Sequence, residues 1–150
     1  TTISQHETSG SGVDEDNRVR FKSLGVGIDP DAVDGHIRAT NDVVFFSSSD
    51  IRLKENITSI YDPLNKISQL RGVTFDWTDD HINQYGGVDD YFMRKQDVGV
   101  IAQEVEEVLP EAVATRDNGM KAVKYEKLVP LLIEAVKELT EKVERLERGA

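Results

Sequence analysis

The sequence predicts an α+β fold: a short β-structured part near the N-terminus, then a helix-rich unit that ends in a long helix. Three observations support this prediction. Residues 18–48 contain short β-prone runs that Gly, Asp and Pro separate. After residue 49, apolar side chains recur every three or four positions, which indicates helices. The last part, Lys127 to Arg148, is rich in strong helix formers.

The chain divides into three parts by composition. Residues 1–17 are polar and acidic, and we expect a linker or a flexible end. Residues 18–48 are too few to bury much apolar area, so their strands need the preceding chain or further copies as partners. Residues 49–150 form the helix-rich unit. The chain begins at Thr1 without methionine, and we expect it to be a fragment of a longer protein.

The strands and helices follow from the pattern of apolar residues. Within residues 18–48 the β-prone runs are Val19–Phe21, Gly25–Ile28, His36–Ala39 and Val43–Phe46. Further on, a helix is expected to run to about Leu70, with Pro63 in its first turn and Asp62 as its cap. A strand follows through Val73, Phe75 and Trp77.

The remainder of the helix-rich unit contains turns, one helix and a hairpin. Residues 78–97 are acidic and rich in turn formers, so we expect a long exposed excursion. Val98 to Ala102 is expected to be a strand, and Gln103 to Leu109 a helix that ends before Pro110. Asp117-Asn118-Gly119 predicts a tight turn between two strands.

Apolar residues in the last helix form a heptad seam of about two and a half repeats. This pattern suits a coiled coil and equally suits one amphipathic helix packed on its own domain. Valine and leucine in these places favour a parallel dimer by local rules. The seam consists of Val129, Leu132, Val136, Leu139, Val143 and Leu146.

Composition excludes several classes of protein. With 28 acidic and 18 basic residues the net charge is -10, which argues against nucleic acid and an anionic membrane surface as partners. Without cysteine there is neither a disulfide framework nor a thiolate zinc site. Asp29, Asp31 and Asp34 are similar to part of a calcium loop, but Thr40 stands where such a loop needs glutamate. We predict no metal and no cofactor.

Ser49 and Lys54 form the candidate catalytic pair. A serine hydroxyl needs a base to act as a nucleophile, and a lysine that burial deprotonates can serve. Serine–lysine pairs are an accepted variant of the serine–histidine arrangement. The spacing alone is weak evidence, because serine-rich stretches are usually loops and a nearby lysine is usually a solvated charge.

Four ordered blocks of sequence carry a resemblance to a known family. They are SSSDIRLKENI, Phe75-Asp76-Trp77, GVIAQEVEEVLPEAV and VKYEKLVPLLIEAVKEL. Together they resemble the C-terminal intramolecular chaperone and self-cleaving peptidase domain of phage endosialidases, tail spikes and tail fibres. The resemblance runs from Ser49 to about Leu146, and residues 18–48 resemble the stalk end of a phage fibre.

The resemblance implies a homotrimer that helps three fibre chains wind together and is then released by self-cleavage. It implies Ser49 as nucleophile, Lys54 as base, and a cut at the Ser49-Asp50 bond, although the geometry of an acyl shift favours the Ser48-Ser49 bond. Residues 79–97 then correspond to a variable loop that contacts the stalk. Four further positions match the family's motifs with no role assigned: Arg52, Asn56, Gln103 and Glu104.

The expected partners are two further copies of the chain and the preceding stalk, with no nucleic acid and no membrane. The expected location is a virion tail-fibre precursor, made in the host cytoplasm, whose chaperone part is released on maturation. The alternative function is a non-catalytic trimerisation and attachment module. A third function we considered is self-cleavage of a membrane-bound transcription factor. We discount it, because this sequence contains neither a basic DNA-binding region nor a transmembrane helix.

Overall fold

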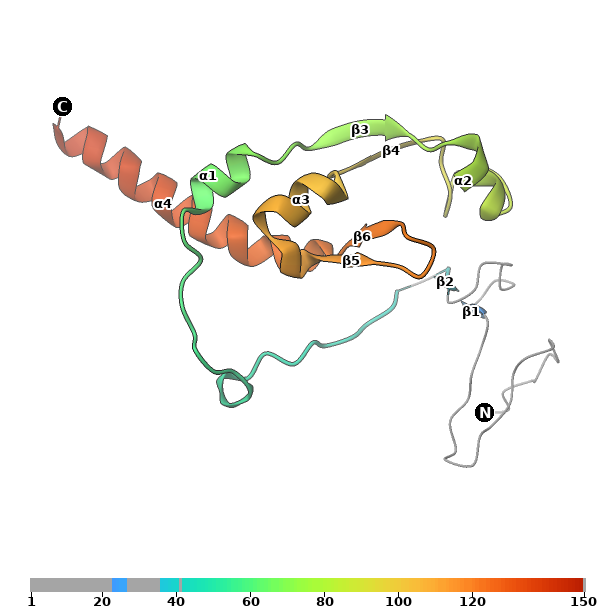
Figure 1. The fold of residues 1–150 in the computed structure, drawn as a ribbon, viewed down its shortest axis with the longest axis horizontal. Coiled ribbons are helices and arrows are strands. Elements are labelled where there is room, and N and C mark those ends of the chain that lie inside the picture. Colours follow the sequence, from blue (N-terminus) through green and yellow to red (C-terminus); the bar gives the residue numbers. More distant parts are fainter. Residues whose placement is uncertain (1–22, 27–35, 41, 150) are drawn as a thin grey trace. The chain divides into compact units, whose positions relative to one another are not determined.

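The computed structural model describes residues 23–26, 36–40 and 42–149 (Figure 1). The chain divides into two compact units. One comprises Thr1–Ser47 together with Asp76–Asp97, and the other comprises Ser48–Phe75 together with Val98–Ala150. The excursion 78–97 therefore groups with the N-terminal part of the chain, although the two are far apart in sequence.

The N-terminal β-structured part of the first unit contains two described strands. Strand β1 (Ser23–Val26) pairs in parallel with β2 (His36–Ala39), with Ser23 opposite His36. The strand expected at Val19–Phe21 and the rejected calcium loop lie outside the described residues, as does the end of the Gly25–Ile28 run. The prediction of a strand at Val43–Phe46 is wrong, because this run has no regular secondary structure. Its side chains are exposed, and a β-prone run forms no strand without a partner for its backbone groups.

The excursion also contains a helix that the sequence did not predict. Helix α2 (Asp79–Gln84) begins after Thr78, whose hydroxyl accepts a hydrogen bond from the His81 amide at 3.2 Å. The acidic residues of its first turn suit the positive end of the helix dipole. Ile82 and Met93 are buried, so the excursion has a small apolar centre of its own.

The second unit begins, after the segment 48–62, with helix α1 (Pro63–Ser68), which ends two residues earlier than expected. Asp62 occupies the position before the helix, but its side chain does not cap it. That carboxylate instead accepts a hydrogen bond from the Asn65 side chain at 2.9 Å. The Leu64 amide donates to Glu138, 74 residues further along the chain, at 3.3 Å.

Strand β3 (Val73–Asp76) pairs with β4 (Gln96–Gly99), which confirms a strand in each place. The second strand is shifted from its expected range, because the backbone turns into helix α3 (Ala102–Val108). The short helix η2 (Pro110–Ala112) follows. The predicted hairpin is present: β5 (Val113–Thr115) pairs antiparallel with β6 (Lys121–Val123).

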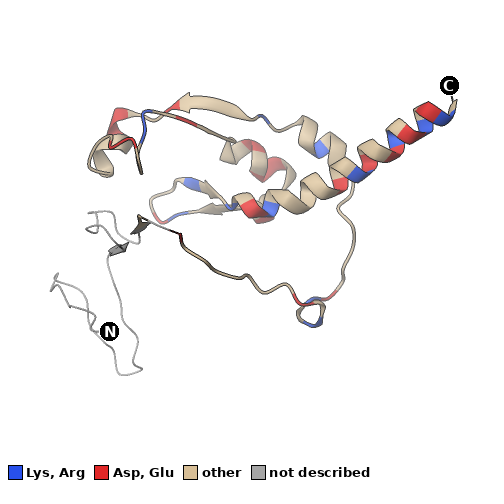
Figure 2. Ribbon diagram, turned by 180° about the vertical axis from the view of Figure 1, so that it is seen from behind, with Lys and Arg blue, Asp and Glu red and all other residues tan. Residues whose placement is uncertain are grey.

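The long C-terminal helix is confirmed as α4 (Leu128–Gly149), which follows the short helix η3 (Tyr125–Lys127). Leu131 and Ala135 are buried on the face of α4 that faces its own unit, where the helix contacts α1. Acidic and basic residues alternate along the C-terminal half of α4 (Figure 2). The six seam residues remain at least 45% exposed in the single chain: Val129, Leu132, Val136, Leu139, Val143 and Leu146. The α+β class is thus confirmed, while the trimer stays a prediction.

Candidate functional site

A single helical turn brings Ser49 and Lys54 together. The short helix η1 (Ile51–Leu53) begins after Asp50, whose carbonyl accepts a hydrogen bond from the Leu53 amide at 3.1 Å. The Lys54 amide closes the turn by donating to the carbonyl of Ile51 at 3.1 Å. The ammonium nitrogen Nζ of Lys54 donates to Oγ of Ser49 at 2.8 Å. The predicted pair is therefore in hydrogen-bonding contact, held by local backbone geometry.

Asp50 and Arg52 form a fork within the same turn. Oδ1 of Asp50 accepts hydrogen bonds from the Arg52 amide at 2.9 Å and from Nε at 3.0 Å. Oδ2 accepts from the terminal guanidinium nitrogen Nη2 at 2.8 Å. The side-chain bonds from Arg52 lower the pKa of Asp50, followed by the amide bond and, more weakly, the charge of Lys54. Reciprocally, Asp50 raises the pKa of Arg52.

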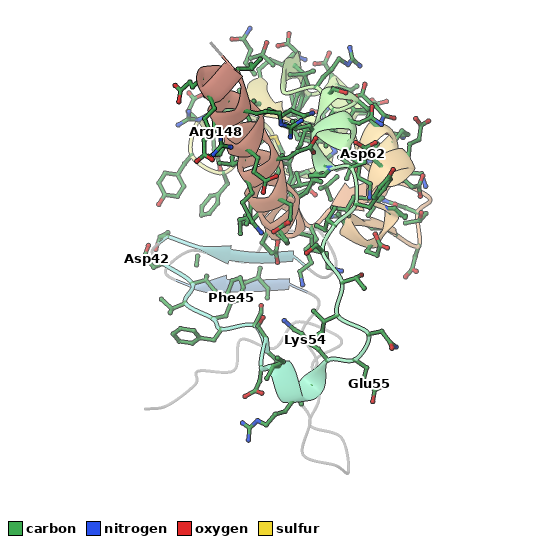
Figure 3. All side chains as sticks on the ribbon, turned by 90° about the vertical axis from the view of Figure 1, so that its left-hand side faces the viewer. Asp42, Phe45, Lys54, Glu55, Asp62 and Arg148 are labelled. Atoms are coloured by element: carbon green, nitrogen blue, oxygen red, sulfur yellow. The ribbon has the colours of Figure 1, made fainter. Side chains whose placement is uncertain are left out.

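The turn that carries these residues is exposed. All of residues 42–59 are exposed in the single chain. Figure 3 shows Lys54 and Glu55 pointing to opposite sides of the backbone, as expected where the chain is extended. The hydrogen bond between Lys54 and Ser49 therefore forms on an exposed part of the single chain, with Nζ as donor and Oγ as acceptor.

Asn56 occupies a special backbone position two residues after Lys54. Its φ angle is +53°, in the left-handed region, where asparagine is tolerated better than most residues. The residue therefore redirects the backbone immediately after the turn. This backbone position is a structural reason for asparagine at residue 56.

Glu104 and Gln103 lie in the first turn of α3. Oε1 of Glu104 accepts a hydrogen bond from Nε of Arg71 at 2.8 Å and also pairs with Nη2 of that guanidinium, while Oε2 accepts from the Arg71 amide at 3.3 Å. The side-chain bond from Arg71 is the main cause of the lowered pKa of Glu104. Glu104 thus ties α3 to the connection between α1 and β3, and the preceding residue, Gln103, is exposed.

The excursion holds itself together through aromatic rings. The ring of His81 stacks on Trp77 with centroids 4.2 Å apart, and the ring centroid of Tyr85 lies 4.8 Å from that of His81. Lys95 closes the base of the excursion by donating to the Trp77 carbonyl at 2.8 Å and to Asp79 at 2.7 Å. Sequence reasoning missed this stack, although His81 in α2 and Tyr85 at its C-cap are four residues apart, a spacing that places side chains on one helix face.

The same excursion contacts the end of the β-structured part. The hydroxyl of Tyr91 donates a hydrogen bond to the carbonyl of Thr40, directly after β2, at 2.7 Å. Asp89 shapes the loop that presents Tyr91, because its Oδ1 accepts from the amides of residues 91–93 at 2.7–3.0 Å. The excursion therefore contacts the residue that directly follows strand β2.

The described residues contain no group of three or more His, Asp or Glu side chains placed to hold a metal ion. None of the helices in that part of the chain is long and apolar enough to cross a membrane.

A comparison with known families decides the identity of the segment that carries this turn. Residues 49–114 match a family model named as a peptidase and described as "Chaperone of endosialidase". This part of the chain belongs to the chaperone of endosialidase family. The match begins at Ser49 and includes Lys54, Arg71 and Glu104, so it covers the exposed turn and the tie between α3 and the α1–β3 connection.

Two curated proteins extend the similarity beyond the chaperone of endosialidase segment. Each is a "Long tail fiber protein Gp37", one from Enterobacteria phage K3 and one from Enterobacteria phage T2. Both are 36% identical in an alignment 103 residues long that covers 66% of this chain. The match spans only 8% of the K3 protein and 7% of the T2 protein.

Proposed function

We propose that residues 49–150 form an intramolecular chaperone of a phage tail fibre, which assembles as a trimer and then releases itself by cleavage at Ser49. Membership of the chaperone of endosialidase family and similarity to two tail fibre proteins support the chaperone role. The peptidase name of the family supports self-cleavage. By the same reasoning the chain comes from a virion tail-fibre precursor made in the host cytoplasm.

The observation that carries the cleavage proposal is the 2.8 Å contact between Nζ of Lys54 and Oγ of Ser49. A general base has to lie within hydrogen-bonding reach of the proton that it removes, and this distance satisfies that condition. The pair lies at the start of the segment that matches the family. Arg52 and Asn56 shape the same turn, which accounts for two of the motif positions.

The reaction we propose is an acyl transfer. Neutral Lys54 takes the proton of the Ser49 hydroxyl as Oγ adds to a peptide carbonyl carbon. The tetrahedral intermediate collapses by breaking the C–N bond, and the leaving nitrogen receives the proton from Lys54. Water then hydrolyses the ester, which frees Ser49 and leaves a carboxylate and an amine as the new chain ends.

Two peptide bonds are candidates for the cut. Attack of Oγ on the Ser48 carbonyl closes a five-membered ring and cleaves Ser48-Ser49. Attack on the carbonyl of Ser49 itself closes a strained four-membered ring, so cleavage of Ser49-Asp50 is easier when the hydroxyl comes from a neighbouring copy. The family resemblance favours Ser49-Asp50, and the masses of the fragments distinguish the two.

Assembly supplies the switch in this proposal. In the single chain the turn is exposed, and Lys54 donates a hydrogen bond to the Ser49 hydroxyl. Large apolar side chains beside the turn are exposed as well, among them Phe46 at 97% and Ile51 at 73%. If further copies or the stalk cover these side chains, the turn loses water and the neutral form of lysine is favoured. In this proposal, cleavage takes place only after assembly.

Chaperone action follows from the seam and the excursion. Three chains that have to intertwine meet a large entropic barrier, because chain entropy is lost before contacts between distant residues stabilise the structure. A trimer held through the α4 seam brings the chain ends together at high effective concentration. The Tyr91–Thr40 hydrogen bond supports a role for the excursion in arranging the stalk end. Removal of the chaperone afterwards leaves a kinetically trapped fibre.

The test is the intact mass of the purified protein after prolonged incubation, beside Ser49→Ala and Lys54→Ala. We expect two fragments that sum to the full chain plus one water in the parent alone. A single intact mass in all three proteins contradicts self-cleavage.

The second candidate function is a permanent, non-catalytic trimerisation and attachment module. The exposure of Lys54 and its role as hydrogen-bond donor to Ser49 favour this alternative. An intact trimer after prolonged incubation supports this alternative, and fragments that depend on Ser49 exclude it.

A further inference from the structure

Asp50 lies between two cations within one turn of chain. Three hydrogen bonds from Arg52 engage both oxygens of its carboxylate. Lys54 is close enough that its charge also acts on Asp50. Glu55, the other charged residue of this turn, lies on the opposite side of the backbone from Lys54 (Figure 3). Among the described residues of this turn, Asp50 is therefore the acid placed to compete with Ser49 for Lys54.

A free carboxylate beside Lys54 would oppose the proposed chemistry. An opposite charge nearby favours the protonated form of lysine, which cannot act as a base. A direct ion pair would also draw Nζ away from Oγ of Ser49. Covering the turn in an assembly strengthens both effects, because electrostatic attraction grows as water is excluded.

We propose that Arg52 is a positioning residue for self-cleavage, whose guanidinium holds the Asp50 carboxylate in a fork and so keeps Lys54 directed at the Ser49 hydroxyl. This inference rests on the proposed function, and it gives Arg52 a task beyond shaping the turn. Both oxygens of Asp50 are occupied by Arg52, while Nζ of Lys54 is bound to Oγ of Ser49. The Asp50 carboxylate also caps η1 by accepting a hydrogen bond from the Arg52 amide. One carboxylate therefore caps the short helix and pairs with a guanidinium at the same time.

Arginine suits this task better than lysine. Its planar guanidinium binds both oxygens of a carboxylate at once, whereas an ammonium binds as a single point. The fork is exposed, with 85% of the Arg52 side chain accessible, so its contribution to the stability of the whole fold is small. We therefore expect substitutions at Arg52 to change the pH dependence of cleavage far more than the folding of the chain.

The experiment measures the rate of self-cleavage between pH 6 and 10, by intact mass, for the parent, Arg52→Gln and Arg52→Lys. Arg116→Gln, in the β5–β6 turn, is the matched control, because it removes the same charge elsewhere. We expect Arg52→Gln to cleave about tenfold more slowly at neutral pH and to regain rate about one pH unit higher. Arg52→Lys is expected to fall between Arg52→Gln and the parent.

A double-mutant comparison isolates the cause. In the Asp50→Asn background the competing charge is absent, so Arg52→Gln is expected to leave the pH profile unchanged. A shift of equal size in that background overturns the proposal. An equal loss of rate at every pH in Arg52→Gln also overturns it, since that result indicates a structural role alone.

A second readout separates this inference from the proposed function. In the Ser49→Ala background, which does not cleave, the labelling of Lys54 by acetic anhydride is followed against pH by peptide mass. Arg52→Gln is expected to move the onset of labelling about one unit upward, while Arg116→Gln does not. Unchanged labelling in Arg52→Gln refutes the role of Arg52, whether or not the parent cleaves. An uncleaved parent with shifted labelling refutes self-cleavage alone.

Discussion

The hydroxyl of Tyr125 accepts a hydrogen bond from the amide of Val100 at 3.2 Å, directly beside Gly99. A Cβ atom at Gly99 would lie 2.5 Å from that hydroxyl oxygen and 3.4 Å from the ring of Phe75. Only glycine lets the Tyr125 side chain approach so closely. This contact joins the end of β4 to η3, the short helix that leads into α4.

Gly99→Ala is expected to displace the Tyr125 hydroxyl and break its hydrogen bond. The expected loss of stability is about 1–2 kcal/mol, from the lost bond and local crowding. Urea denaturation followed by circular dichroism measures it. Gly72→Ala is the control, because a Cβ there meets nothing within 4 Å. In the Tyr125→Ala background the cost of Gly99→Ala should largely disappear, and a persistent cost would contradict this explanation.

Stability is expected to depend on pH through Glu104. Because Arg71 holds the pKa of Glu104 below the ordinary value of 4.5, the folded state binds this proton less readily than the unfolded state. The stabilisation is therefore fully present above pH 4.5 and is lost as the pH falls through the lowered pKa. We expect the parent to have a higher Tm than Glu104→Gln at pH 7.

The two melting temperatures should converge in strongly acidic buffer, where Glu104 of the parent is protonated. Glu107→Gln, on an exposed position of the same helix, is the control and should follow the parent throughout. Added salt should reduce the difference at pH 7, because the Arg71 side chain is exposed. A difference that persists at pH 2 would show that the ion pair is not its cause.

Glu138 is expected to hold α1 against α4. One oxygen of its carboxylate accepts from the Leu64 amide, and the other pairs with Lys142 at 2.8 Å. Since Asp62 does not cap α1, removal of Glu138 leaves the first turn of that helix without this acceptor. Glu138→Ala should speed hydrogen exchange of the α1 amides, whereas Glu147→Ala, nearer the end of α4, should not. Equal exchange in both variants would contradict the role of Glu138.

The seam on α4 is expected to hold a trimer. Light scattering of uncleaved protein should give about three times the chain mass of 16.8 kDa. Leu139→Glu places a charge in the seam and should yield monomer, because burying an unpaired charge is costly. Thr140→Glu adds the same charge one position away and should leave the trimer intact. A mass of twice 16.8 kDa for the parent would favour the parallel dimer that local rules suggest.

Local sequence determined those parts of the molecule whose contacts are close along the chain. The α4 helix, the β5–β6 hairpin with Gly119 at a φ of +79°, and the turn between Ser49 and Lys54 all depend on neighbours within a few residues. Helix α2 also carried a local signal, Thr78 before two aspartates, which the acidic and turn-rich composition of the excursion obscured.

Only the tertiary structure decided the contacts between distant residues. Arg71 and Glu104 are 33 positions apart, and Leu64 and Glu138 are 74 apart, so no local pattern could pair them. The apolar run Val43–Phe46 shows the converse: its composition favours a strand, yet a strand forms only where a partner supplies hydrogen bonds. Secondary-structure propensity reflects interactions between residues that are close in sequence. The placement of a cap, an ion pair or a strand depends instead on which distant parts of the chain the fold brings together.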